Sequence, residues 1–198
     1  NNDEIVYVSA GEGTTSQGDF HEALNWASNL RAPVIFHIQD NEYAISTHKS
    51  VQNADSVYSI SSGYRNLSRY NVDGIDFFET NLAFKEAIKR ARKGKGPSLI
   101  VSNVVRLLPH SSSDDQRKYR TEKELLDDQE RDPLVIFKRK AVKNNIIKES
   151  EFKKIELEIK KSIEKDVEWS LSQKDPNPNN AQRYVYSPTS IEVEAAEN

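Results

Sequence analysis

Two short polar loops, each preceded by an apolar run, constrain this chain more than any other feature. Residues 11–13 read Gly-Glu-Gly after the apolar residues 5–9, and residues 40–43 read Asp-Asn-Glu-Tyr after the apolar residues 34–38. Continuous apolar runs of this length are typical of buried parallel strands. The two loops are about 30 positions apart, the length of one strand–helix–strand unit. Because ligands of open α/β sheets bind beyond the carboxyl ends of the strands, we expect both loops at one ligand-binding edge.

The donor atoms in these loops suit a hard cation and a diphosphate bound to it. Glu12 offers a carboxylate oxygen, Asn41 an amide oxygen and Tyr43 a backbone carbonyl. Mg²⁺ prefers oxygen ligands and usually shares them with phosphate groups and water. The glycines beside Glu12 allow a close backbone approach, and a helix expected from residue 18 directs free N–H groups to the same edge. The sequence therefore predicts a Mg²⁺–diphosphate site.

The first loop taken alone has a simpler interpretation, a strand-to-helix turn. It is not a dinucleotide-binding fingerprint, since Ser16 occupies the third glycine position, and the chain has no Walker A lysine. The second loop favours the ligand-binding interpretation because both loops must be explained together.

The alternation of elements predicts a parallel α/β sheet flanked by helices. Strands are expected at 5–9, 34–38, 70–72 and 99–105, and helical segments at 18–30, 55–67 and 81–93. After a polar loop at 107–119, a capping box at Thr121 to Glu124 opens a helix. Further helices are expected from Pro133 to about 144 and from Ser150, the last with an apolar face of Phe152, Ile155, Ile159 and Ile163.

Composition excludes several classes of protein. The chain has 198 residues, 36% of them hydrophobic and 30% charged, as in a globular protein with one full core. A net charge of −3 provides no general basic field for nucleic acid, and no apolar run is long enough to span a membrane. The absence of cysteine excludes disulfides and thiolate metal sites. Since the chain lacks methionine and begins close to a strand, we expect an N-terminally incomplete fold.

Several stretches together resemble a known family. Besides the two loops, residues 21–25 read His-Glu-Ala-Leu-Asn and residues 41–47 read Asn-Glu-Tyr-Ala-Ile-Ser-Thr. Further stretches agree in order, at 72–74, 91–92, 96–100, 110–111, 114–115 and 119–120. From roughly residue 4 to 165 the chain resembles the alpha subunit, or the alpha portion of a fused chain, of a thiamine-diphosphate-dependent 2-oxo acid dehydrogenase. The resemblance implies the thiamine-diphosphate-binding fold.

The resemblance implies roles for particular residues. The Mg²⁺ ligands would be Glu12, Asn41 and the Tyr43 carbonyl. Gly13 and Thr14 would contact the diphosphate, and Ile45 would lie near the pyrimidine or central part of the cofactor.

Three residues depart from the family pattern. Most relatives have aspartate in place of Glu12 and a second asparagine in place of Asp40. Gln39 stands where branched-chain members often carry an arginine that helps to bind the diphosphate, so we expect weaker cofactor binding.

His110 lies in the polar loop and is the candidate catalytic residue. The resemblance implies that it contacts the diphosphate and assists acyl transfer to the lipoyl group, and a histidine can change charge near neutral pH. The alternative is an exposed loop histidine followed by capping serines.

Pro109 departs from the histidine often found there. Ser111 or Ser113 corresponds to loop serines that are phosphorylated in animal relatives, and the other three histidines are expected to be structural.

The implied activity is decarboxylation of a 2-oxo acid and transfer of the acyl group to lipoamide. Residues 43–47 favour a branched-chain substrate, while pyruvate and acetoin dehydrogenases, or a truncated non-catalytic assembly module, stay open as alternatives. The implied partners are a beta subunit or fused beta portion, which supplies the catalytic glutamate in a heterotetramer, and the lipoyl domain of the acyltransferase component. We expect this chain alone to be inactive, and expect a bacterial cytoplasmic or mitochondrial matrix location.

The resemblance and the element pattern together predict four segments. Residues 1–106 would form the partial cofactor-binding domain and 107–120 the active-site loop. Residues 121–174 would form C-terminal helices of the same domain, and 175–198 a linker or extended tail.

Overall fold

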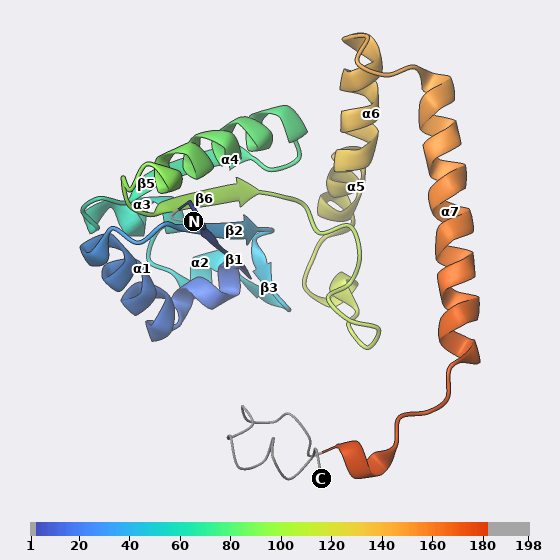
Figure 1. The fold of residues 1–198 in the computed structure, drawn as a ribbon, viewed down its shortest axis with the longest axis horizontal. Helices are drawn as coiled ribbons and strands as arrows, with labels where there is room; N and C mark the ends of the chain where they lie inside the picture. Colours follow the sequence, from blue (N-terminus) through green and yellow to red (C-terminus); the bar gives the residue numbers. More distant parts are fainter. Residues whose placement is uncertain (1–2, 182–198) are drawn as a thin grey trace. The chain divides into compact units, whose positions relative to one another are not determined.

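A four-stranded parallel sheet lies at the centre of the fold (Figure 1). The structure is a computed structural model that describes residues 3–181. It divides into two units, and the sheet belongs to the first. The two units comprise residues 1–146 and 147–198. The strand order is β1-β2-β6-β5. The strands are β1 (Val6–Gly11), β2 (Val34–Asp40), β5 (Ser68–Asp73) and β6 (Ser98–Asn103). All the pairings within this four-stranded sheet are parallel, which confirms the predicted α/β class.

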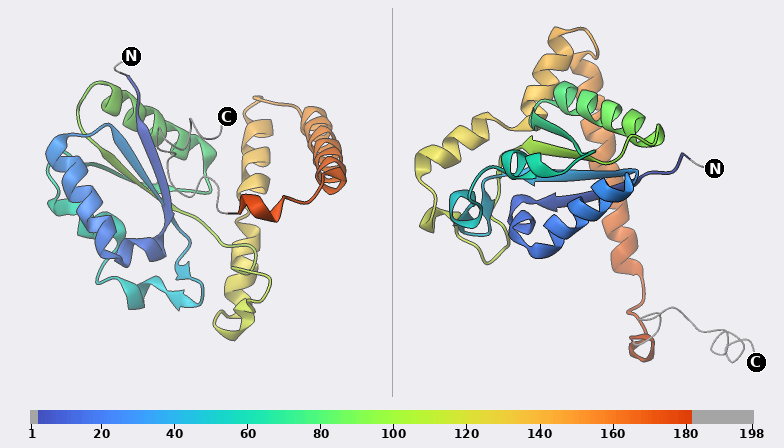
Figure 2. Two further views of the ribbon diagram at one scale, coloured as in Figure 1. Left: turned by 60° about the horizontal axis from the view of Figure 1, so that its bottom comes forward. Right: turned by 90° about the vertical axis from the view of Figure 1, so that its left-hand side faces the viewer.

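Helices cover both faces of this sheet, as the two views in Figure 2 show. On one face lie α1 (Gly18–Leu30) and the short helix α3 (Val57–Ile60). On the other face lies α4 (Phe77–Arg92). The first unit ends with α5 (Glu122–Glu130) and α6 (Pro133–Lys143).

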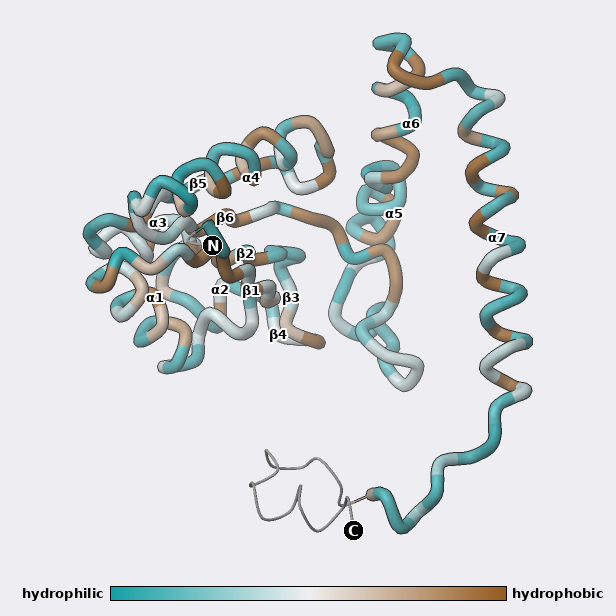
Figure 3. Tube along the Cα trace, viewed as in Figure 1, coloured by the Kyte–Doolittle hydropathy of each residue, from teal (hydrophilic) through white to brown (hydrophobic). Residues whose placement is uncertain are grey.

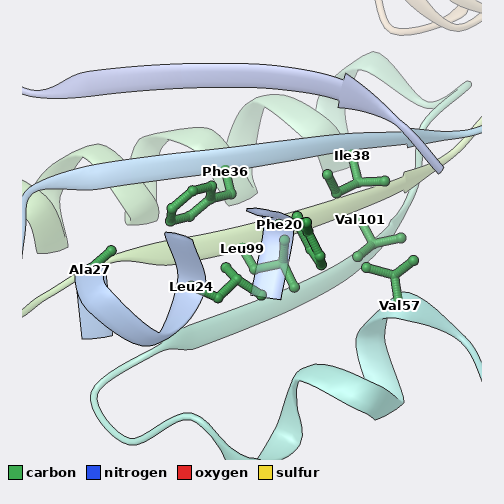
Figure 4. Close-up of a cluster of buried hydrophobic side chains, with 8 residues drawn as sticks. All are labelled: Phe20, Leu24, Ala27, Phe36, Ile38, Val57, Leu99 and Val101. Atoms are coloured by element: carbon green, nitrogen blue, oxygen red, sulfur yellow. The ribbon is translucent and has the colours of Figure 1, made fainter. Parts of the chain in front are cut away.

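The apolar strands divide their side chains between two cores because successive residues of a strand point to opposite faces. One core joins α1 and α3 to alternate residues of β2 and β6 (Figure 4), and consists of Phe20, Leu24, Ala27, Phe36, Ile38, Val57, Leu99 and Val101. The other joins α4 to the intervening residues of β2 and β6 and to β5, and consists of Ile35, Val72, Ala83, Ala87 and Ile100. The continuous apolar runs of β2 and β6 are thus explained by burial on both faces.

The prediction that residues 5–9 form a buried strand was wrong about burial. The strand is present as β1, but Val6, Tyr7 and Val8 are 54%, 53% and 42% exposed. β1 lies at the end of the strand order, so one of its edges has no neighbouring strand among the described residues. An apolar pattern indicates a strand but does not reveal its place in the sheet.

Helix boundaries follow local capping. The predicted helix at 18–30 coincides with α1. The one predicted at 81–93 begins earlier, at Phe77, because the Asp76 carboxylate accepts a hydrogen bond from the Phe78 N–H at 2.9 Å. The capping box of Thr121 and Glu124 is confirmed. The segment at 55–67 contains only α3 and the 3₁₀ turn Ser61–Gly63.

Two short elements after β2 were not predicted. They are a hairpin of β3 (Tyr43–Ala44) and β4 (Thr47–His48), followed by helix α2 (Lys49–Gln52). Segments of two to four residues are too short to show a periodic pattern.

The second unit contains α7 (Glu149–Ser172) and the 3₁₀ turn Pro178–Asn180. The predicted apolar face is present along α7, where apolar and polar residues alternate (Figure 3), and Ile155, Ile159 and Ile163 are exposed. None of the described helices has the length and apolar character needed to cross a bilayer. The predicted tail falls largely on residues 182–198, which lie outside the described part. The predicted boundaries at 106, 120 and 174 stay predictions.

Candidate functional site

The two polar loops meet at the carboxyl edge of the sheet. Glu12 opens the 3₁₀ helix Glu12–Ser16 directly after β1, and Asn41 follows β2. The ends of the two strands are in register, with Gly11 opposite Gln39. The backbone N–H of Asn41 donates a hydrogen bond to Glu12 Oε2 at 3.3 Å. The structure therefore brings together the two residues on which the sequence argument depended.

The second loop is folded around the Asn41 side chain. Its Oδ1 atom accepts a hydrogen bond from the Tyr43 N–H at 3.2 Å, and Glu42 between them has a positive φ of 72°. An amide oxygen carries two lone pairs, so Asn41 Oδ1 retains one for a further partner. The loop thus holds the Asn41 amide and the Tyr43 backbone within a single tight turn.

Glycine at position 13 is required by the packing of one loop on the other. A Cβ atom built there would lie 2.6 Å from Ala44 Cβ, a distance that atoms of this kind do not tolerate. The neighbouring Thr14 is exposed, whereas Thr15 is fully buried. The Thr15 hydroxyl donates to the Glu12 carbonyl at 2.5 Å and accepts from Asn53 Nδ2 at 3.0 Å. Thr15 therefore fixes the backbone of Glu12. Nothing in the sequence pattern predicted this role for Thr15.

The Glu12 carboxylate is buried and is not paired with a cationic side chain in the described part of the chain. The residue is 2% exposed. Removing a carboxylate from water is costly unless a cation or several hydrogen bonds compensate it. The hydrogen bond from Asn41 supplies only part of that compensation. The donor chemistry of this edge therefore fits a hard cation such as Mg²⁺.

Such a cation would be held by a mixed set of oxygens. Among residues 3–181, no group of three or more His, Cys, Asp or Glu side chains could hold a metal ion. One carboxylate, one amide oxygen and one carbonyl are nevertheless sufficient where phosphate and water complete the coordination.

A second charged cluster, not predicted from the sequence, lies beside this site. Lys49 Nζ lies 3.0 Å from Asp40 Oδ2 and 3.3 Å from Glu42 Oε1. Burial disfavours the charge on Lys49, but its bonds to the two carboxylates outweigh that effect and raise its pKa. Together with Glu12 and Asn53, Asp40 and Lys49 line a depression of about 270 Å³. The sequence did not indicate the ion pair between Lys49 and Asp40, because the hairpin that lies between the two residues was not predicted.

His110 is exposed and does not reach either loop directly. Its backbone N–H donates to Asp114 Oδ2 at 2.9 Å, and in the part of the chain that is described its imidazole makes no hydrogen bond to residues 11–13 or 40–43. Hydrogen bonds from the Tyr119 hydroxyl and from the His110 N–H lower the pKa of Asp114. The structure thus orders the His110 backbone without fixing the direction of its imidazole.

A chain of hydrogen bonds connects the His110 loop to the hairpin. Arg106 Nη1 donates to the Ile45 carbonyl at 2.7 Å, and Nη2 donates to the Tyr119 hydroxyl at 2.6 Å. That hydroxyl donates in turn to Asp114 Oδ2 at 2.6 Å. Burial, and then the bond to Asp114, raises the pKa of Tyr119. Ile45 itself is 54% exposed at the hairpin tip and has a positive φ of 55°, which is unusual for a β-branched residue.

The Tyr43 ring is packed against two guanidinium groups. Its centroid lies 5.6 Å from the Arg106 Cζ atom and 5.3 Å from that of Arg120. The Tyr43 hydroxyl donates to Glu124 Oε1 at 3.2 Å, and burial followed by the Glu124 charge raises the pKa of Tyr43. Arg120 also pairs with Asp128 of α5. Tyr43 was predicted as a site residue through its backbone carbonyl, whereas Arg106, Arg120 and Glu124 were missed, although the Tyr-Arg pair at 119–120 was part of the family resemblance.

A parallel α/β sheet with a buried carboxylate at its carboxyl edge is typical of α/β proteins that bind ligands at that edge. Comparison with known families makes this more specific. The family described as "Dehydrogenase E1 component" matches residues 1–179, so the chain belongs to that family. The resemblance predicted from the two loops is thereby confirmed.

Curated proteins similar to this chain include alpha subunits of dehydrogenases. The chain is 41% identical over 136 residues to the 2-oxoisovalerate dehydrogenase subunit alpha of Bacillus subtilis (strain 168), covering 68% of this chain and 41% of that protein. It is 36% identical over 158 residues to the pyruvate dehydrogenase E1 component subunit alpha of Acholeplasma laidlawii, covering 79% and 46%. The chain therefore spans less than half the length of these relatives. A transketolase variant from Pichia stipitis aligns with a TM-score of 0.45 and 23% identity, over 50% of this chain and 15% of that one.

Proposed function

We propose that this chain forms the thiamine-diphosphate- and Mg²⁺-binding part of the first component of a 2-oxo acid dehydrogenase. The assembled enzyme would decarboxylate a 2-oxo acid and transfer the acyl group to lipoamide. The observation that carries the proposal is the buried, uncompensated Glu12 carboxylate hydrogen-bonded to the Asn41 backbone. Thiamine diphosphate, when bound, supplies the electron sink for decarboxylation.

The residues of this chain would bind and position the cofactor. Glu12, Asn41 Oδ1 and the Tyr43 carbonyl would hold Mg²⁺. Gly13 and Thr14 would contact the diphosphate beside it. The Thr15 hydroxyl, bonded to the Glu12 carbonyl, would keep the metal-binding backbone in place.

His110 would hold and transfer a proton at its imidazole during acyl transfer, a role that suits a side chain able to change charge near neutral pH. The bonds from Arg106 to Ile45 and Tyr119 would keep the His110 loop beside the hairpin. Ile45 at the hairpin tip would lie near the pyrimidine or central part of the cofactor.

We favour a branched-chain 2-oxo acid because residues 43–47 read Tyr-Ala-Ile-Ser-Thr. A pyruvate or acetoin dehydrogenase is the alternative, and the near-equal identities to a 2-oxoisovalerate and a pyruvate dehydrogenase subunit keep it open. The proposed partners are a beta subunit or fused beta portion and the lipoyl domain of the acyltransferase component. The proposed location is the bacterial cytoplasm or the mitochondrial matrix.

Calorimetry tests the cofactor proposal directly. The chain is titrated with thiamine diphosphate in Mg²⁺, alone and with its beta subunit. We expect binding heat in the presence of the beta subunit, its loss in Glu12→Ala, and its retention in Glu22→Ala, which removes an exposed carboxylate from α1. Absence of heat in both titrations would overturn the proposal and favour a non-catalytic assembly module. Rates with 2-oxoisovalerate and pyruvate on the assembled enzyme then separate the two substrate classes.

A further inference from the structure

A second depression, of about 350 Å³, lies near the start of β5. Ser68 and Tyr70 of β5 line one side of it, and residues from the last turns of α4 and the turn after it line the other. Ser68 is the first residue of its strand, whereas Glu12 follows the last residue of β1. Because the strands are parallel, this depression lies toward the opposite end of the sheet from the candidate cofactor site.

The depression is strongly and asymmetrically charged. Its lining contains the cations Lys89, Arg90, Lys93 and Lys95 and a single carboxylate, Glu86. No ion pair with a carboxylate involves any of the four cations among the described residues, in contrast to Lys49 and Lys140 elsewhere in the first unit. A concave surface lined by one sign of charge concentrates ions of the opposite sign.

The backbone is shaped to bring these cations together. Gly94 and Gly96 have positive φ angles of 63° and 91°, and a Cβ atom at Gly96 would lie 2.9 Å from the Asn66 carbonyl oxygen. The resulting turn folds back on the helix, since the Lys95 N–H donates to the Arg90 carbonyl at 3.2 Å. Lys95 is thereby held beside the end of α4 although it follows the helix in sequence.

Arg90 is anchored in this wall by a hydrogen bond to the backbone of a neighbouring turn. Its Nη2 atom donates to the Asn66 carbonyl at 2.9 Å, but its buried Nε atom has no hydrogen-bond partner within the protein. That Nε atom has almost no exposed surface, so an anion in the depression would be bound by the outer guanidinium nitrogens and by the lysine ammonium groups.

The favourable interaction of cations with the carboxyl end of the α4 helix explains only part of this group of four cations. Cations in the last helical turn, such as Lys89 and Arg90, interact favourably with the carboxyl end of a helix. Lys93 is the C-cap residue and Lys95 is held beside the end of the helix, so the dipole attracts them as well, but four cations gathered at one helix end also repel one another.

We propose that this depression binds a small phosphorylated anion. Its volume lies within the range of small-ligand sites. Guanidinium and ammonium groups are the usual phosphate partners, and the Ser68 and Tyr70 hydroxyls offer additional donors. The site is independent of the proposed cofactor site, because it shares no residue with it.

The test is a titration of the full chain with inorganic tripolyphosphate and, separately, with ATP, in the absence of divalent metal. Calorimetry gives the affinity, and thermal denaturation gives the shift in Tm. The double variant Lys93→Gln/Lys95→Gln removes two cations of the depression. The matched control Lys153→Gln/Lys160→Gln makes the same charge change on exposed positions of α7.

We expect the parent chain and the control to bind alike, and the Lys93→Gln/Lys95→Gln variant to bind at least about tenfold more weakly while remaining folded. Retention of tripolyphosphate binding in Glu12→Ala would separate this site from the cofactor site. Tighter binding of ATP than of tripolyphosphate would identify a nucleotide as the ligand class. Equal affinity of the parent and the pocket variant, no binding at millimolar anion, or tighter binding of a polyglutamate peptide than of tripolyphosphate would each overturn the proposal.

Discussion

The backbone N–H of Asn41 lies 3.3 Å from Oε2 of Glu12, so two loops that are distant in sequence share one hydrogen bond at the carboxyl edge of the sheet. This contact makes the Glu12 carboxylate the link between the loops. It also leaves a buried negative charge whose compensation depends on what binds there.

The first prediction concerns Glu12→Gln. Glutamine retains an acceptor for the Asn41 N–H but removes the buried charge, so the metal-free chain should become more stable, by about 1 kcal/mol or more. In the complex with the beta subunit, the increase in Tm that Mg²⁺ and thiamine diphosphate produce should disappear, with the affinity reduced about 100-fold. Thermal denaturation with and without Mg²⁺ measures both effects. A less stable metal-free variant would contradict the idea that Glu12 is uncompensated.

The second prediction concerns the close approach of the two loops. In Gly13→Ala the new methyl group meets Ala44 Cβ at 2.6 Å, and we expect a loss of about 1–3 kcal/mol in the free energy of unfolding. Gly11→Ala is the matched control, because a Cβ atom there meets nothing within 4 Å and φ is an ordinary −81°. Urea denaturation of both variants provides the comparison. Partial recovery in Gly13→Ala/Ala44→Gly would assign the loss to this contact.

Much of the sheet and its first loop could be predicted, because the pattern of apolar residues indicates the strands and the distance between the loops matches one strand–helix–strand unit. The apolar run of β2 implied burial on both faces, and the parallel arrangement implied that Glu12 and Asn41 would meet. The exposure of Tyr7 could not be predicted. It depends on the place of β1 in the strand order, and the local sequence pattern does not show which strands pair with β1.

The chain of contacts around the hairpin was also beyond sequence reasoning. Arg106 contacts Ile45 and Tyr119, which lie 61 and 13 positions from it. No periodic pattern links such residues, and the β3–β4 hairpin that presents the Ile45 carbonyl is too short to be recognised. The family resemblance marked Tyr119 without indicating what it binds.

The third prediction tests this connection with Arg106→Gln. The variant loses charge-assisted bonds to the Ile45 carbonyl and the Tyr119 hydroxyl, each worth about 1.5–3 kcal/mol. Amide hydrogen exchange across residues 107–119 should therefore accelerate at least about tenfold. Arg117→Gln is the control, because its pair with Asp115 is on the surface and the Arg117 side chain is 79% exposed. Unchanged exchange in Arg106→Gln would show that other contacts hold the loop.

The fourth prediction concerns pH and His37, which is buried on β2. Its Nδ1 lies 2.9 Å from the Tyr7 hydroxyl and its Nε2 lies 2.9 Å from Ser102 Oγ, and burial lowers its pKa below the ordinary value of 6.5. The unfolded chain therefore takes up a proton at a higher pH than the folded chain does. The contribution of His37 to stability is complete above pH 6.5 and falls as the pH drops below it.

Urea unfolding from about pH 8 to about pH 5 measures this effect as the difference between the parent chain and His37→Gln, which removes the titrating group from the same cavity. The parent should lose more of its free energy of unfolding than the variant as the pH falls through this range, because only the parent takes up the additional proton on unfolding. Parallel pH profiles for the two proteins would show that the folded state accommodates the imidazolium, and that the bonds to Tyr7 and Ser102 can rearrange around it.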